Sequence, residues 1–249
     1  MWLALEAQDD EPAAFEPGHV LGLGIEIDGL LTRHAYTVSR GDASKGRFEH
    51  LYRVIRDGRL SPRLAGLSSG DIVHFHGPFH TPIQQEVRSV AERIVLMSTG
   101  AGIGPIFGYA EKSLSEGESR PITLYAGFRY ESDTCLEPEL ARLAQEHPNF
   151  AWHFTLTRPP ATWNGLTGRV TECVPYLIDR ENLKTYHFHL VGNGEMVHLT
   201  KDALHLAGIP AGQVSIETYF NHHVRPERAE VERLATAFSH REKVPQRGE

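Results

Sequence analysis

The stretch IVLMSTGAGIGP at residues 94–105 decides how this chain folds. Its first four residues form an unbroken apolar run, which is typical of a strand buried on both faces. Gly100, Gly102 and Gly104 then alternate with small residues, and helical spacing resumes over residues 106–112. A helix that begins directly after a glycine-rich turn leaves backbone N–H groups uncovered, which suits a phosphate or pyrophosphate. Taken alone, the stretch is equally consistent with a tight strand-to-helix turn that binds nothing.

After this stretch, strand-like and helix-like segments alternate. Further strands are expected at residues 122–128, 150–156, 187–192 and 214–220. Helices are expected at residues 105–115, 136–146, 171–178 and 195–207, followed by a polar helix from Pro226 to about His240. Such alternation predicts a Rossmann-like α/β domain, in which a parallel sheet carries helices on both faces. The tail after Lys243 is expected to be disordered.

Before this stretch the pattern is one of short strands divided by turn residues. The strand-like runs are WLALE at residues 2–6, EPGHVLGLGIEI at 16–27, HAYTVSR at 34–40, HLYRVI at 50–55 and DIVHFHG at 71–77. Short strands with frequent turns predict a small antiparallel β-barrel. The change of rhythm near residues 81–92 predicts a first domain at residues 1–88 and a second at 89–249, the latter ending in a helical tail.

Composition limits the classes of function. A chain of 249 residues has room for two modest domains, and its net charge of −7 argues against nucleic acid as the main partner. Two cysteines, Cys135 and Cys173, are too few for a four-cysteine iron–sulfur or zinc site and give no disulfide framework. An acidic start and the lack of a membrane-length apolar stretch favour a soluble cytoplasmic protein.

Two segments of the first domain offer groups that suit a flavin nucleotide. Tyr36 provides a flat ring on a strand, and Thr37 provides a hydroxyl beside it. Ser61, which follows Gly58 in a turn, would place a small donor and bare amides near a pyrophosphate. Without further context, such residues are more often a half-buried strand aromatic and an ordinary turn.

These segments resemble the FAD-binding barrel of the ferredoxin–NADP reductase family, in its stand-alone bacterial form. The family has an Arg-x-Tyr-(Ser/Thr) strand and then a Gly-x-Leu-(Ser/Thr)-x-x-Leu turn. The matching residues are Tyr36, Thr37, Gly58, Leu60, Ser61 and Leu64. The resemblance implies that the tyrosine packs against the isoalloxazine, while the arginine and the second hydroxyl hold the FAD pyrophosphate. His34 occupies the arginine position and Arg33 precedes it by one residue, so either is a candidate for the phosphate contact.

The second domain resembles the same family. Residues 98–105 are similar to its Gly-Thr-Gly-x-Ala-Pro nucleotide loop, with Ala101 in place of the threonine whose hydroxyl lies near the nicotinamide. Residues 190–196 are similar to its Cys-Gly-x-x-x-Met motif, with Val191 in place of the cysteine. The positions that match are Gly100, Gly102, Pro105, Gly192 and Met196.

Two arginines flank the loop PPATWNGLT. Arg158 closes a strand and Arg169 opens a helix, so both are expected at the carboxyl edge of the sheet, where nucleotides bind. The similar pair in bacterial reductases implies a clamp on the 2′-phosphate of NADP, which modestly favours NADPH over NADH. Arg129 is a further candidate phosphate contact, whereas Asp133 would accept from an unphosphorylated ribose. Without the resemblance, these arginines are equally well read as solvated surface residues.

Glu217 and Tyr219 end the last expected strand and resemble the Glu-x-Tyr near the end of several family members. The resemblance implies that the aromatic ring covers the flavin and that the carboxylate holds the nicotinamide or relays protons, which makes this pair the catalytic candidates. The implied cofactor-binding residues are Arg33, His34, Tyr36, Thr37, Val38, Gly58, Leu60, Ser61, Thr99, Gly100, Ala101, Gly102, Arg129, Arg158, Arg169, Gly192, Asn193 and Met196.

Histidine pairs invite a metal site. The pairs are His74 with His76, His187 with His189, and His222 with His223. No carboxylate or cysteine stands at ligand spacing beside them, so surface or interstrand histidines are expected and no metal is predicted.

The sequence therefore predicts an FAD-binding antiparallel barrel followed by a Rossmann-like NAD(P)-binding domain. The expected activity is hydride transfer from NADPH, or NADH, to the flavin, and then single-electron transfer to a ferredoxin, a flavodoxin or an oxygenase component. Arg56, Arg59 and Arg63 are candidates for docking an acidic carrier. The alternatives are a free-flavin or ferric reductase and a non-catalytic flavin- or nucleotide-binding electron-transfer subunit. No nucleic acid or membrane partner is expected.

Overall fold

The structure is a computed structural model that describes residues 1–8 and 14–239. Contacts divide the chain into two compact units. Unit 1 comprises Met1–Glu86 and Ala101–Glu118, and unit 2 comprises Val87–Gly100 and Ser119–Glu249. The predicted division of the chain between residues 88 and 89 stays a prediction.

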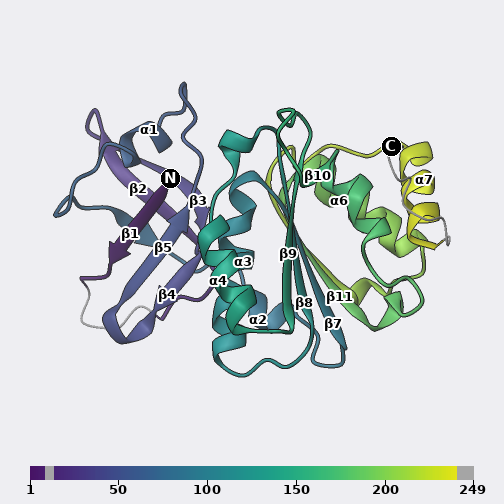
Figure 1. Cartoon of the computed structure of the whole chain (residues 1–249). Coiled ribbons are helices and arrows are strands. Elements are labelled where there is room, and N and C mark those ends of the chain that lie inside the picture. Colours follow the sequence, from purple (N-terminus) through teal and green to yellow (C-terminus); the bar gives the residue numbers. More distant parts are fainter. Residues whose placement is uncertain (9–13, 240–249) are drawn as a thin grey trace. The chain divides into compact units, whose positions relative to one another are not determined.

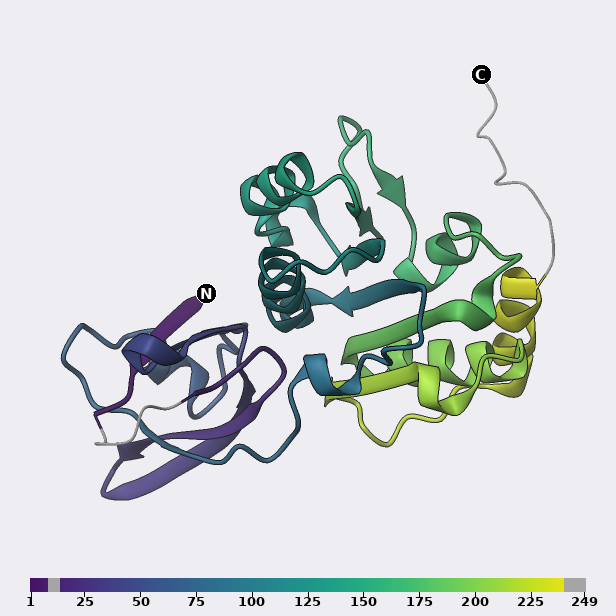
Figure 2. The ribbon, with the colours of Figure 1, turned by 90° about the horizontal axis from the view of Figure 1, so that it is seen from below.

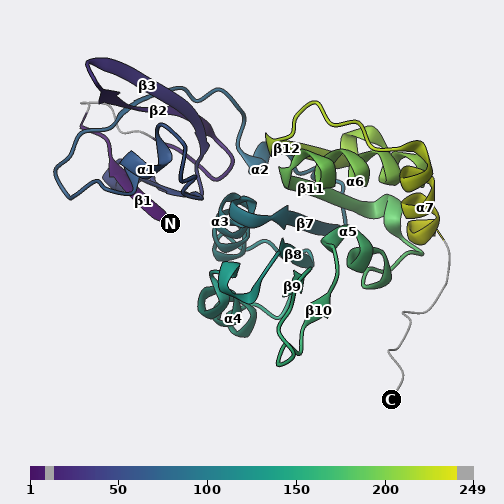
Figure 3. The same cartoon turned by 90° about the horizontal axis from the view of Figure 1, so that it is seen from above.

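Unit 1 contains two antiparallel sheets. One has the order β1-β5-β4, with β1 at Trp2–Glu6, β4 at Arg40–Asp42 and β5 at Arg47–Leu51. The other has the order β3-β2-β6, with β2 at Val20–Ile27, β3 at Leu30–Thr37 and β6 at His74–His76 (Figure 3). Leu21 and Leu23 of β2 pack with Phe48 of β5 in one buried cluster. The predicted antiparallel architecture is confirmed.

The chain changes sheets between β3 and β4. The run HAYTVSR is a single strand in the prediction, but Thr37 ends β3 and Arg40 begins β4. Between them Val38 N donates to His19 O at 2.8 Å, whereas Ser39 N donates to Glu49 O of β5 at 2.7 Å. The strand expected over HLYRVI is likewise earlier in the chain, because β5 covers Arg47–Leu51.

Three α-helices of unit 1 are α1 (Ser61–Leu64), α2 (Ile83–Glu86) and α3 (Ile103–Ser115). The helix α3 follows the 3-10 turn Gly100–Gly102, as the glycine-rich stretch predicts. Contacts group this helix with the antiparallel sheets.

Unit 2 is built on a parallel sheet (Figure 1), and its strand order is β10-β9-β8-β7-β11-β12 (Figure 3). The strands are β7 (Arg93–Thr99), β8 (Ile122–Phe128), β9 (Phe150–Leu156), β10 (Leu166–Thr167), β11 (Tyr186–Asn193) and β12 (Val214–Phe220). Helix α4 (Glu137–Glu146) lies on one face, and α5 (Val170–Cys173), α6 (Gly194–Leu206) and α7 (Arg228–Ser239) lie on the other (Figure 3). The predicted α/β fold is confirmed.

One helix of unit 2 is shorter than predicted. The helix expected over residues 171–178 is the short α5 followed by a 3-10 turn at Val174–Tyr176, which contains Pro175. The expected polar helix is α7, which packs beside α6 and buries Leu234, Ala235 and Phe238 (Figure 2). His240 and the tail after Lys243 lie outside the described residues. In the part of the chain that the structure describes, no helix is long and apolar enough to cross a membrane.

Candidate functional site

Tyr36 lies at the end of β3 with its ring half-buried. It pairs with Leu21, a fully buried residue of β2, so both side chains lie on the core face of the hairpin. Its ring meets the Tyr52 ring edge-on at a centroid distance of 5.7 Å. Burial, and next the nearby Tyr52, raise the pKa of Tyr36 to about 12. The phenol is therefore a neutral hydrogen-bond donor at ordinary pH.

The strand pleat separates the two candidate phosphate-binding residues. His34 pairs with the buried Leu23 and lies on the same face of β3 as Tyr36. Arg33 lies over Gly24 on the opposite face, because a Cβ at Gly24 would stand 2.7 Å from the Arg33 Cγ. Only His34 therefore shares the face of Tyr36.

The turn before α1 is held by the Ser61 side chain. Its Oγ accepts from Ile55 N at 3.0 Å, and Gly58 N donates to Ile55 O at 2.8 Å. Leu60 and Leu64 anchor the turn, with exposed fractions of 1% and 2%. Because the Oγ acts as an acceptor within the turn, the hydroxyl proton of Ser61 is available to an anionic oxygen.

His50 supports this strand from inside unit 1, a role not foreseen from the sequence. Its Nδ1 donates to Thr37 O at 2.8 Å, and burial lowers its pKa to about 4. In the described part of the chain, the buried Nε2 of His50 and the hydroxyl of Tyr52 have no hydrogen-bond partner. The alternation of Phe48, His50 and Tyr52 along one face is the signal that would have predicted this burial.

The carboxyl end of β7 provides the first part of the candidate nucleotide site. Gly100 has a φ of 57°, and a Cβ at this position would meet nothing within 4 Å. Open space beside a left-handed glycine permits a ligand to approach the backbone closely. Ala101 and Gly102 complete the turn, and α3 begins at Ile103. The turn therefore fits the pyrophosphate that the motif predicts.

The neighbouring strand β11 provides the second part. Gly192 has a φ of 132°, and the hydroxyl and backbone of Thr99 occupy the space that a Cβ there would need. Asn193 N donates to Thr99 Oγ1 at 2.9 Å. The Oδ1 of Asn193 accepts from Glu195 N and from Asn221 Nδ2, each at 3.1 Å. Thr99, Gly192 and Asn193, three of the predicted residues, are thus brought together at one sheet edge.

The three predicted arginines of unit 2 are exposed at the same edge. Arg129 follows β8, and its carbonyl accepts from Arg158 N at 2.8 Å. Arg158 Nη1 donates to the Tyr130 hydroxyl at 3.0 Å, and its guanidinium lies 5.9 Å from that ring's centroid. Arg169 is the N-cap of α5. In the part of the chain that the structure describes, these three guanidinium groups form no ion pair with a carboxylate, which leaves their charge to attract an anion.

Other predicted residues have packing roles. The side chains of Val38, Leu60 and Met196 are buried, with exposed fractions of 0%, 1% and 6%. The resemblance implies that all three contact a cofactor, which stays a prediction, and their buried side chains pack against the strands and turns that carry them. Glu217 and Tyr219 are half-buried on one face of β12, where Glu217 is in register with Val191.

A buried polar chain on the sheet was not foreseen. Arg88 N donates to His187 Nδ1 at 3.4 Å, so the ring proton of His187 is on Nε2. That Nε2 lies 2.8 Å from Ser215 Oγ, which in turn lies 2.7 Å from His189 Nδ1. Burial, and then the charges of Arg120 and Arg88, lower the pKa of His187 to about 4. In the described ranges, no group of three or more His, Cys, Asp or Glu side chains is placed to hold a metal ion.

Antiparallel sheets carrying Tyr36 and a parallel sheet with a glycine turn at its carboxyl edge define a class, the two-domain nucleotide-binding oxidoreductases. Residues 3–82 match the oxidoreductase FAD-binding domain, and residues 96–202 match the oxidoreductase NAD-binding domain. The chain belongs to the ferredoxin reductase-like family of flavoproteins. The predicted family and its two nucleotide cofactor classes are confirmed.

Curated relatives differ in how much of their length they share with this chain. Ferredoxin–NADP reductase B of Sorangium cellulosum is 26% identical, over 87% of this chain and 90% of the relative. NADH-cytochrome b5 reductase 1 of Candida albicans is 31% identical, over 65% and 54%. The plasma membrane-associated coenzyme Q6 reductase PGA3 of Saccharomyces cerevisiae is 29% identical, over 62% and 49%. The chain thus spans about half the length of the last two proteins.

Solved structures show the same fold. The cytochrome P450 reductase GcoB of Amycolatopsis superimposes with a TM-score of 0.75 at 25% identity, over 88% of this chain and 65% of that one. A ferredoxin NADP+ reductase of Neisseria gonorrhoeae, solved with bound FAD and NADP, gives 0.73 at 21% identity, over 88% and 92%. Relatives with different electron acceptors thus share this architecture.

Proposed function

We propose that the chain is an NADPH-dependent flavoprotein reductase that delivers electrons to a separate protein carrier. The observation that carries this proposal is the edge made by Thr99, Gly100 and Gly192, in a chain whose other domain is an FAD-binding one. When bound, FAD would supply the step from a two-electron hydride donor to one-electron acceptors. The protein's own residues have to bind and orient the two nucleotides.

On the flavin side, the residues present fit the cofactor in part. Tyr36 offers a neutral, half-buried aromatic ring, and Ser61 offers a hydroxyl proton to the pyrophosphate. His34 takes the place of an arginine and is the cation candidate on the same strand face. A histidine supplies a weaker and pH-dependent charge, so FAD is expected to bind less tightly than with an arginine there.

On the nicotinamide side, the open turn at Gly100 would receive the pyrophosphate of the dinucleotide. Arg158 and Arg169 would hold a 2′-phosphate, which favours NADPH over NADH. Glu217 and Tyr219 are proposed to contact the nicotinamide and the flavin. Hydride transfer depends on positioning more than on acid–base groups, so Ala101 and Val191 are compatible with activity.

The proposed carrier is a ferredoxin, a flavodoxin or an oxygenase component. Cys135 and Cys173 are free thiols and cannot ligate a four-cysteine cluster, which supports an electron acceptor on another protein. Arg56, Arg59 and Arg63 are exposed around the turn that precedes and contains α1, and they suit an acidic partner. A cytoplasmic location belongs to the same proposal.

The test is spectroscopic. Purified protein reconstituted with FAD is expected to show flavin absorption that NADPH bleaches under anaerobic conditions, faster than NADH does. Reoxidation by ferredoxin or flavodoxin, compared with free FMN and ferric citrate, then distinguishes a carrier reductase from a free-flavin or ferric reductase. A colourless protein that cannot be reconstituted would contradict the proposal and leave a non-catalytic binding subunit.

A further inference from the structure

Helix α3 lies directly on the antiparallel sheets of unit 1. Gly104 and Gly108, one turn apart, face the segment between β3 and β4. A Cβ at Gly104 would strike Ser39 Oγ and stand 2.7 Å from Leu51 Cβ, and a Cβ at Gly108 would strike the Ser39 carbonyl oxygen. Two glycines therefore permit the helix backbone to approach the strands closely.

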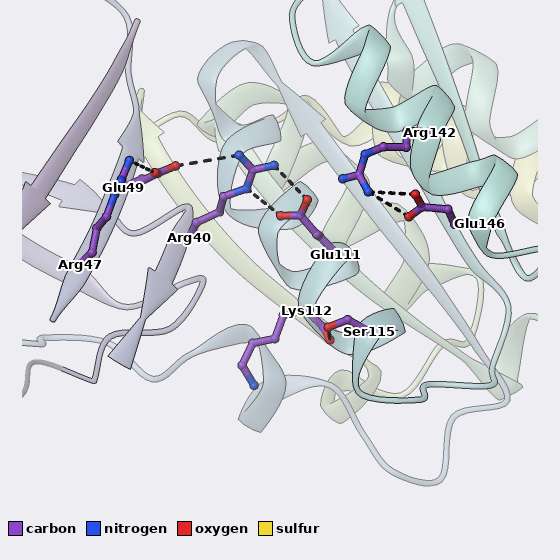
Figure 4. A network of polar contacts seen from close by, with 8 residues as sticks. All are labelled: Arg40, Arg47, Glu49, Glu111, Lys112, Ser115, Arg142 and Glu146. Carbon is purple, nitrogen blue, oxygen red and sulfur yellow. Dashed lines mark hydrogen bonds and ion pairs between the residues drawn. The ribbon is translucent and has the colours of Figure 1, made fainter. Parts of the chain in front are cut away.

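Arg40, which follows Ser39 in the chain, binds the same helix through its side chain. Its Nε and Nη2 donate to the two carboxylate oxygens of Glu111 at 2.7 and 3.0 Å, across 71 residues of sequence (Figure 4). Its Nη1 lies 3.9 Å from a Glu49 oxygen on β5. The guanidinium also lies 4.9 Å from the Phe107 ring centroid and 5.4 Å from that of Trp2. One side chain thus contacts β1, β5 and two turns of α3.

The other polar contacts of the helix with the sheets are weaker. Lys112 Nζ lies 3.8 Å from a Glu16 oxygen and only 2.7 Å from Glu116 on its own helix. The side chains of Arg40 and Glu111 are 30% and 28% exposed, close to the 33% and 38% of Lys112 and Glu16, so the two pairs differ in geometry rather than in burial. A bidentate arginine–carboxylate pair holds its geometry better than a single, longer lysine contact does.

The chain passes from unit 2 to unit 1 inside the glycine turn, between Gly100 and Ala101. Ala101, Gly102 and the first turn of α3 therefore belong with the antiparallel sheets, although they complete the nucleotide turn that β7 begins. We propose that Arg40 is a positioning residue for hydride transfer, because it fixes α3 and the second half of that turn to the flavin-binding unit. This inference rests on the proposed reductase function and deepens it.

Arg40→Met in the full-length FAD-bound protein is the direct test, because methionine keeps an apolar stem and removes the fork. Arg228→Met is the control: Arg228 Nε donates to Glu232 Oε1 at 2.7 Å, an arginine–glutamate pair within α7 of unit 2. Arg40→Lys keeps the charge without the fork. Three quantities are measured: amide hydrogen exchange over residues 103–115, the dissociation constant of NADP+, and the rate of flavin reduction with its deuterium isotope effect.

Arg40→Met is expected to speed exchange in α3, weaken NADP+ binding and slow flavin reduction, each by about tenfold or more, since a displacement of ~1 Å costs ~100-fold in rate. The FAD content is expected to stay the same, Arg40→Lys to be intermediate, and Arg228→Met to match the wild type. Glu111→Gln is expected to show part of the Arg40→Met effect, and the double variant to be less than additive, because the two residues share one bidentate interaction.

Equal behaviour of Arg40→Met and Arg228→Met would overturn the inference. So would faster exchange without any loss of NADP+ binding or reduction rate, since Arg40 would then be structural only. If Arg40→Met loses FAD or unfolds, the same criteria are applied to Arg40→Lys and Glu111→Gln. Failure of the wild type to be reduced by NADPH or NADH would refute the reductase function instead, and the NADP+ binding comparison would still decide the role of Arg40.

Discussion

Gly192 and Thr99 are so close that no side chain fits at position 192. The φ of Gly192 is 132°, and a Cβ there would strike the Thr99 hydroxyl and lie 2.8 Å from its carbonyl oxygen. The same hydroxyl accepts from Asn193 N at 2.9 Å. The ends of β7 and β11 are thus joined by a contact that only glycine permits, and this contact shapes the candidate nucleotide edge.

Gly192→Ala is expected to lower the free energy of unfolding by about 2 kcal/mol or more, from backbone strain combined with overpacking. Urea denaturation measures the loss. Gly117→Ala is the control, because Gly117 has a φ of 94° but nothing within 4 Å of its Cβ position, so it isolates the strain. A loss at position 192 no larger than that at 117 would argue against the Thr99 contact.

Thr99→Val removes the acceptor for Asn193 N with little change of shape. A loss of about 1–3 kcal/mol in the free energy of unfolding is expected, because a backbone donor at the sheet edge is left without its partner. Thr99→Ser keeps the hydroxyl and is expected to retain most of the stability. If valine and serine prove equally destabilising, the hydroxyl is not what joins the two strands.

Much of the fold was predictable because its signals are local. The apolar run of β7, the glycines after it and the alternation of strands and helices all lie within short windows of sequence. The change of sheets between Thr37 and Arg40 was not predictable in this way, since it depends on Glu49 of another strand. Nor does a local pattern reveal that α3 packs on the antiparallel sheets.

The candidate site shows the same limit. The motifs place Thr99, Gly192 and Asn193 at the ends of two strands, and these residues meet at one sheet edge because parallel strands end at the same edge. Gly104 departs from the alanine of the family loop, and the reason lies at Ser39, which a Cβ would strike. Likewise, the buried His187 forms its hydrogen bonds with Arg88 and Ser215 from distant segments. Such contacts between distant segments were not evident from a single sequence.

His34→Arg is expected to tighten FAD binding. The new guanidinium would lie on the face of β3 that carries Tyr36 and would give a bidentate, charge-assisted contact to the pyrophosphate. A gain of about 1.4 kcal/mol corresponds to a tenfold lower dissociation constant, measurable by fluorescence titration of apoprotein. Arg33→Gln is the control on the opposite face and is expected to change the constant less than twofold. A larger effect at position 33 than at position 34 would assign the pyrophosphate contact to Arg33 instead of His34.

Acidification is expected to destabilise the fold through His50 and His187. Their pKa values are lowered to about 4, below the ordinary value of 6.5, so the unfolded chain binds more protons between these limits. The stabilisation is complete above pH 6.5 and is lost as the pH falls toward 4, by about 2 kcal/mol per histidine between pH 7.5 and 5. Urea denaturation at both pH values measures this loss. His187→Asn is expected to flatten the dependence, whereas His147→Asn, on a residue at the end of α4, is not.

Arg158→Leu is expected to separate the two nicotinamide nucleotides. If Arg158 binds the 2′-phosphate, its loss should raise the KM for NADPH by about tenfold or more, since a charge-assisted hydrogen bond contributes roughly 1.5–3 kcal/mol. The KM for NADH should change little. Tyr130→Phe is the matched variant, because it removes the hydroxyl that accepts from Arg158 at 3.0 Å but keeps the aromatic ring beside the guanidinium. Steady-state reduction of ferricyanide with each nucleotide gives both constants, and an equal loss with NADPH and NADH would assign Arg158 to a part of the dinucleotide that the two share.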